Sequence, residues 1–119
     1  MISDFENPDG AAYVRWKFPG GRVDKQYSGA VYGVVLASGD GVAVVEPFQG
    51  DPNNGVIYNA DGSVRVRLVN PLTSMAAKCF MYPYYVGSEL TFVDALPGVQ
   101  FGCVFDPADG RLVRTYESR

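Results

Sequence analysis

Residues 55–68, with the sequence GVIYNADGSVRVRL, consist of two short apolar runs joined by the loop Asn59-Ala60-Asp61-Gly62. Asparagine and aspartate side chains bond to their own backbone in turns, and glycine adopts positive φ angles at no steric cost. The stretch therefore predicts a β-hairpin. Residues 101–116 repeat the pattern around Asp109 and Gly110, which predicts another hairpin near the C-terminus.

The second arm of the first hairpin alternates with a period of two, which is typical of a strand with one face in water. Its apolar side chains are those of Val64, Val66 and Leu68, and its polar side chains are those of Ser63, Arg65 and Arg67. We expect Arg65 and Arg67 to form a short basic stripe on a solvated strand face. The alternative is that this stripe contacts an anion or an acidic partner.

The most apolar part of the chain is residues 30–47, which are interrupted by Ser38-Gly39-Asp40-Gly41. This pattern predicts a hairpin that is apolar on both faces, so we expect it in the middle of the fold, covered on each side. Residues 12–18 alternate as a strand does, whereas residues 1–10 are interpreted as a lead-in or tail and residues 22–29 as a polar connection.

These patterns predict one all-β domain over residues 1–119, a length that suits a single core. We expect an antiparallel meander of about eight to nine short strands, rolled into a barrel or a sandwich. At most one short helical turn is expected, near residues 71–78. Every connection is short enough to join antiparallel neighbours, and no long helical crossover is available for a parallel sheet.

The net charge of −3 and the absence of a long apolar run shape the expected partners and location. An acidic chain is poorly suited to neutralise nucleic-acid phosphates, and a membrane-spanning helix needs about 18 or more apolar residues. We therefore expect neither a nucleic-acid nor a membrane partner, and place the protein in the cytoplasm. A basic protein is the partner most compatible with this charge.

Histidine is absent from the chain, which excludes catalytic arrangements and metal sites that depend on it. The two cysteines, Cys79 and Cys103, lie in apolar runs and are interpreted as buried free thiols, with a disulfide as the alternative. We expect no catalytic residue, no metal site and no cofactor.

Most carboxylates have a simple explanation, because six of the nine aspartates directly precede glycine or proline and fit turns. Two others stand out. Glu46 ends an apolar run and Asp94 shares a strand face with Leu90 and Phe92, so either could be buried with a raised pKa. The preferred alternative is a strand-end carboxylate paired with Arg65, Arg67 or Arg114.

An aromatic cluster surrounds Pro83, which cannot donate to a strand ladder and so predicts an edge or a bulge. If residues 78–86 form a strand, Phe80, Tyr82 and Tyr84 share one face, and Tyr85 lies beside them. Tyrosine offers a large contact area with a polar tip, as recognition surfaces do. The alternative is that these rings cover the core from an edge strand.

Three functions fit these observations. The first is a non-enzymatic protein-binding module, such as an inhibitor or an immunity-type protein that neutralises a basic partner. The second is a small-molecule-binding β-barrel or a carboxylate-based enzyme, with a pocket lined by Phe92, Phe101, Phe105 and Tyr58 and with Glu46 or Asp94 pointing inward. The third is a structural subunit that assembles through strand edges. The oligomeric state is not determined by the sequence.

Overall fold

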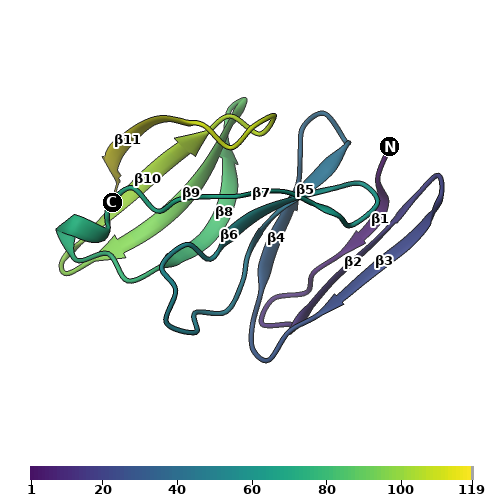
Figure 1. Cartoon of the computed structure of the whole chain (residues 1–119), viewed down its shortest axis with the longest axis horizontal. Helices are drawn as coiled ribbons and strands as arrows, with labels where there is room; N and C mark the ends of the chain where they lie inside the picture. The colour runs from purple at the N-terminus through teal and green to yellow at the C-terminus, as the bar shows by residue number, and fades with distance from the viewer. Residues whose placement is uncertain (119) are drawn as a thin grey trace.

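The computed structural model describes residues 1–118 and contains eleven strands in three antiparallel sheets (Figure 1). Its single helical segment within that range is a 3-10 turn, η1 (Thr73–Met75), where a helical turn was expected. The all-β prediction is confirmed. Within residues 1–118, no helix is long and apolar enough to cross a bilayer.

Each sheet is a meander of consecutive strands. The N-terminal sheet contains β1 (Ser3–Glu6), β2 (Tyr13–Phe18) and β3 (Gly21–Gln26). The middle sheet contains β4 (Tyr32–Val35), β5 (Gly41–Val45), β6 (Gly55–Asn59) and β7 (Val64–Arg67). The C-terminal sheet contains β8 (Phe80–Val86), β9 (Glu89–Leu96), β10 (Val99–Phe105) and β11 (Leu112–Ser118).

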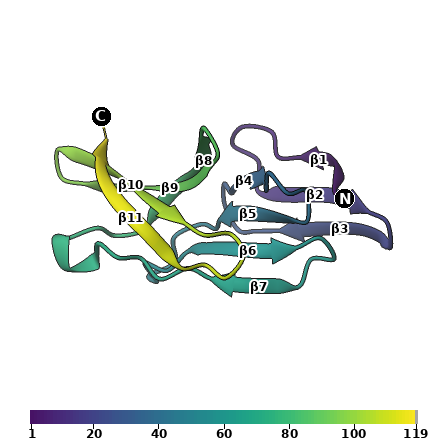
Figure 2. The same ribbon diagram turned by 90° about the horizontal axis from the view of Figure 1, so that it is seen from above.

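The middle sheet is covered on both faces, as its apolar sequence predicted. Val42 and Val44 of β5 pack with Trp16 of the N-terminal sheet. The alternate residues Ala43 and Val45 belong to the second core cluster, which includes aromatic rings of the C-terminal sheet. Figures 1 and 2 show the three sheets following one another along the long axis of the molecule. The sheets pack as a sandwich and do not close into a barrel.

The structure has more strands than expected, because β1 and β3 lie in segments interpreted as lead-in and connection. β3 pairs with β2 over its whole length, yet Val23 is its one buried residue. A strand with so few apolar residues shows no clear alternation. β1 pairs with β2 through Ser3 and Glu6 around a bulge, and Asp4 between them has a positive φ of 51°.

The predicted hairpins form where the turn residues stand. The amide of Asn59 donates to the carbonyl of Ser63, and Gly62 has a φ of 88°. The loops of β4–β5 and β10–β11 contain Gly39 and Gly110, whose φ angles are also positive. Pro83 lies on β8, an edge strand of the C-terminal sheet, as predicted.

Candidate functional site: two grooves beside Glu46

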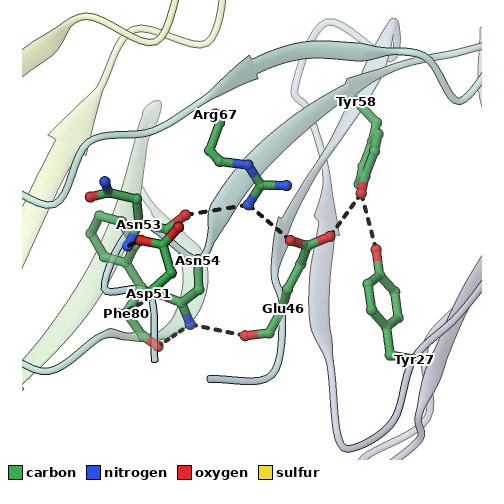
Figure 3. A network of polar contacts seen from close by, with 8 residues as sticks. All are labelled: Tyr27, Glu46, Asp51, Asn53, Asn54, Tyr58, Arg67 and Phe80. Carbon is green, nitrogen blue, oxygen red and sulfur yellow. Dashed lines mark hydrogen bonds and ion pairs between the residues drawn. The ribbon is translucent and has the colours of Figure 1, made fainter. Parts of the chain in front are cut away.

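Glu46 lies directly after β5, where the chain leaves the middle sheet, and its carboxylate joins two neighbouring strands (Figure 3). Oε1 accepts a hydrogen bond from Nη1 of Arg67 at 2.9 Å, and Oε2 accepts one from the hydroxyl of Tyr58 at 2.9 Å. The Glu46 side chain is 19% exposed. Glu46 is therefore paired with Arg67, one of the three arginines named as candidate partners.

The network continues from Tyr58 to Tyr27, which lies just after β3 (Figure 3). The two hydroxyl oxygens are 3.2 Å apart. Burial raises the pKa of both phenols, and the nearby Glu46 carboxylate acts in the same direction. Both hydroxyls therefore remain protonated and can donate hydrogen bonds. The chain of contacts ties the N-terminal sheet to the middle sheet.

Asn54 connects the same region to the C-terminal sheet (Figure 3). Its Nδ2 donates to the carbonyls of Glu46 and Phe80 at 2.9 and 3.0 Å. Its Oδ1 accepts from the amide of Phe80 at 2.8 Å. The buried Asn54 side chain thus replaces a strand partner at the start of β8.

Two open grooves lie on either side of Glu46 and Pro47. The first, called here the apolar groove, measures about 230 Å³ and is lined by Ala30, Tyr32, Val45, Glu46, Pro47, Phe48, Asn54, Cys79, Phe80 and Met81. The second, called here the polar groove, measures about 340 Å³ and is lined by Gln26, Tyr27, Ser28, Glu46, Pro47 and Gln49. Glu46 therefore faces an apolar and a polar surface at once.

The predicted aromatic surface is only partly exposed. β8 has an irregular register, since Phe80 pairs with Asp94 while Tyr82 pairs with the adjacent Val93. This bulge reverses the side-chain alternation. Phe80 is therefore 1% exposed and Tyr82 39% exposed, so the expectation that Phe80, Tyr82 and Tyr84 share one face is wrong.

Tyr84 and Tyr85, the two remaining tyrosines of this cluster, are half-buried. The rings of Tyr82 and Tyr84 lie 5.8 Å apart. Tyr85 packs against the core, and its hydroxyl accepts a hydrogen bond from the amide of Ala37 at 2.9 Å. Tyr85 therefore covers the core from an edge strand, as the alternative interpretation stated, and Tyr82 is the most exposed ring of the four.

Arg65 and Arg67 do not form the expected solvated stripe. Ile57 pairs with Val66 and Tyr58 with Val64, so Arg65 is the extra residue of a bulge. The Arg65 side chain is 17% exposed and donates to Asn59 Oδ1 and to the carbonyls of Pro107 and Asp40. Arg65 thus joins three hairpin loops, whereas Arg67 belongs to the Glu46 network.

Asp94 is fully buried. Asn70 Nδ2 donates to its Oδ1 at 2.8 Å, and Sγ of Cys103 lies 3.5 Å from its Oδ2. Burial raises the pKa of Asp94 and that of the Cys103 thiol. Cys79 and Cys103 are both free thiols, and Cys79 is partly exposed rather than buried. Asp94 is therefore a buried carboxylate with a raised pKa, which is one of the two interpretations given for it above.

The rings predicted to line a pocket fill the core instead. Phe92 and Phe105 pack edge to face at 5.7 Å, and Phe80 packs against both. Tyr58 belongs to the other core cluster, on the opposite face of the middle sheet. These rings therefore do not form the pocket that the small-molecule alternative requires. Across residues 1–118, no group of three or more cysteine, aspartate or glutamate side chains is placed to hold a metal ion.

Three residues of the apolar groove were missed in the sequence. Tyr32, Phe48 and Met81 are 36, 48 and 41% exposed. Phe48 gave a usable signal, since it is a large apolar residue at the start of a polar loop. Met81 gave no such signal. A regular strand would place it on the face opposite Phe80 and Tyr82, and the sequence does not show which of the two faces is exposed.

Comparison with known proteins identifies a shared fold. No protein-family model matches the chain, and no curated protein matches its sequence. The chain is similar to a chain in the solved structure of Tne2 in complex with Tni2, with a TM-score of 0.80. The match covers 100% of both chains at 16% sequence identity. At this identity the likeness is one of fold alone.

Proposed function

We propose that this protein is a non-enzymatic, cytoplasmic protein-binding module that neutralises a basic partner, as an inhibitor or immunity-type protein does. The observation that carries the proposal is the likeness in fold, over the full length of both chains, to a chain in a complex of two proteins. A likeness over the whole chain means that the same framework serves a protein found in such a complex.

The exposed apolar side chains supply a second line of support. Tyr32, Phe48, Met81 and Tyr82 are all more than one third exposed and come from the middle sheet, the loop after β5 and β8. Aromatic residues and methionine are enriched at the centres of protein interfaces. The net charge of −3 favours encounter with a basic protein.

The non-enzymatic part of the proposal rests on how the carboxylates are used. Asp51, Asp61, Asp106 and Asp109 each accept a hydrogen bond from the amide two residues further along the chain. These are the turn roles expected from the sequence. Glu46 is paired with Arg67, and Glu89 with Arg114. These carboxylates are engaged in structural contacts rather than grouped for acid–base chemistry.

The test is affinity purification of the tagged protein from cells that encode it, at about 0.1 M and 1 M salt. We expect a specific basic partner, identified by mass spectrometry, whose recovery falls at high salt. The purified partner should bind the wild-type protein and should bind more weakly to the double variant Phe48→Ser with Met81→Ser. Val113→Ser is the matched control, since Val113 is 45% exposed on β11.

Co-expression tests neutralisation directly. The partner expressed alone should slow growth, and co-expression of this protein should restore it. Failure to recover a basic partner, or growth that is unaffected by either protein, would contradict the proposal. Light scattering on the purified protein separates this function from the assembly-subunit alternative, which requires a concentration-dependent oligomer.

A further inference from the structure

Glu46 and Pro47 form a wall shared by the apolar groove and the polar groove. A ligand that fills both grooves must pass over these two residues. Its apolar part would then rest on one side of the wall and its polar part on the other. Such a division selects a ligand with two chemically different groups next to each other.

The apolar groove is suited to a large side chain. Its outer rim contains the exposed side chains of Tyr32, Phe48 and Met81, and the buried Val45 and Phe80 lie below. Methionine adapts its shape, and an aromatic ring adds contact area at a small entropic cost. A phenylalanine, leucine or tryptophan side chain of a partner would complete this apolar surface.

The Glu46 carboxylate is suited to a cation beside that side chain. Its two oxygens each accept one hydrogen bond within the chain, from Arg67 and Tyr58, and a carboxylate has about four acceptor positions. The polar groove adds the side chains of Gln26, Ser28 and Gln49, and Gln49 donates to the Ser28 hydroxyl at 2.7 Å.

The nearest cations are already engaged. Arg67 is paired with Glu46, and Nζ of Lys25 lies 4.2 Å from the centre of the Tyr58 ring. Asp51 lies in the loop that follows Phe48, and its charge acts on Arg67 together with that of Glu46. A guanidinium group from a partner would therefore meet one partly neutralised carboxylate, so its contribution to affinity should be modest.

We infer that the two grooves together receive a segment of the basic partner in which a large apolar side chain stands next to an arginine or lysine. This inference rests on the proposed function and adds the contact surface and its chemistry. The apolar side chain enters between Tyr32, Phe48 and Met81, and the neighbouring cation reaches Glu46.

The test uses small probes and does not require the partner. ¹⁵N-labelled protein is titrated with acetyl-phenylalanyl-arginine amide and with acetyl-phenylalanyl-glutamate amide. We expect the arginine peptide to shift the amide signals of Phe48, Gln49 and Met81, with a Kd on the order of 1 mM. The glutamate peptide should bind about two- to fivefold more weakly, the size of a half-exposed charge contact.

Variants assign the two parts of the contact. Glu46→Gln should abolish the preference for arginine, whereas Glu117→Gln, which removes the same charge from β11, should retain it. Phe48→Ser with Met81→Ser should weaken both peptides about tenfold, and Val113→Ser neither. If Glu46→Gln does not fold, the wild-type protein is titrated instead at about 1 M salt, where we expect the preference for the arginine peptide to be lost.

Two outcomes would overturn the inference. One is the absence of shifts at these amides with either peptide at about 10 mM, and the other is equal binding of both peptides. A basic partner whose binding is weakened by Phe48→Ser with Met81→Ser and left unchanged by Glu46→Gln would refute the inference and leave the proposed function intact. Peptide binding as expected, with no basic partner recovered from cells, would refute the proposed function and leave the two grooves as a site for an apolar side chain beside a cation.

Discussion

Asp94 shows how far a single residue can depart from its usual environment. Its carboxyl group is fully buried among apolar strands of the C-terminal sheet, and its contacts are Asn70 and Cys103 rather than an arginine. Burial without a cation penalises the charged form, which raises the pKa of Asp94. The fold therefore binds a proton at Asp94 more tightly than the unfolded chain does.

This proton gives stability a defined dependence on pH. Below the ordinary pKa of aspartate, Asp94 is protonated in both states and its contribution to stability is fully present. As the pH rises from that value through the raised pKa of the folded state, ionisation favours the unfolded chain and the free energy of unfolding falls.

We expect Asp94→Asn to remove this dependence and to be at least as stable as the wild-type protein at neutral pH. The amide keeps an acceptor for Asn70 and cannot ionise. Urea denaturation between about pH 4 and pH 7 measures the difference. Parallel pH profiles for the two proteins would contradict the assignment of a raised pKa to Asp94.

At the scale of elements, two bulges decide which side chains reach the surface. The bulge in β7 frees Arg65 to reach Pro107 and Asp40, and the bulge in β8 turns Phe80 inward and Tyr82 outward. Alternation with a strict period of two predicts where the strands lie, but it does not predict which way these side chains point. An inserted residue leaves no mark in the alternation until the partner strand is known.

The hydrogen bonds from Asn54 to the start of β8, called here the clamp on β8, are a second feature at this scale. Asn54 makes three hydrogen bonds that satisfy the backbone of Phe80 and the carbonyl of Glu46. Asn54 and Phe80 are both buried. The start of an edge strand is therefore held by a side chain from the loop that precedes β6.

We expect Asn54→Ala to lower the free energy of unfolding by about 2–4 kcal/mol, because buried backbone groups lose their partners. The Phe80 amide should also exchange faster with solvent, and hydrogen exchange measures this. Gln26→Ala, at an exposed amide on β3, is the control and should change stability by less than about 0.5 kcal/mol. If the Phe80 amide remained as well protected from hydrogen exchange as in the wild-type protein, the clamp would not be needed to hold the start of β8.

At the scale of the whole molecule, the middle sheet provides one face to each of two core clusters. Polar contacts cross both boundaries. Trp16 donates to the carbonyl of Ala60 at 2.7 Å, and Asn54 bonds to Phe80. Because the middle sheet belongs to both cores, loss of either outer sheet would expose one of its apolar faces.

We therefore expect the three sheets to unfold together, as the predicted single domain requires. Trp16, the one tryptophan, reports on the N-terminal sheet by fluorescence, and far-ultraviolet circular dichroism reports on all strands. The two urea transitions should have the same midpoint. A fluorescence transition that precedes the dichroism transition would show that β1–β3 forms a separate unit.

The sequence by itself determined the all-β class, the hairpins around Gly39, Gly62 and Gly110, the double-sided burial of residues 30–47 and the turn roles of the aspartates. These are local properties, set by backbone preferences and by apolar periodicity along a short stretch. Only the tertiary structure decided the division into three sheets, the two bulges, and the grooves beside Glu46. These depend on which strands meet, and a residue's alternation along its own strand carries no information about the strand that will cover it.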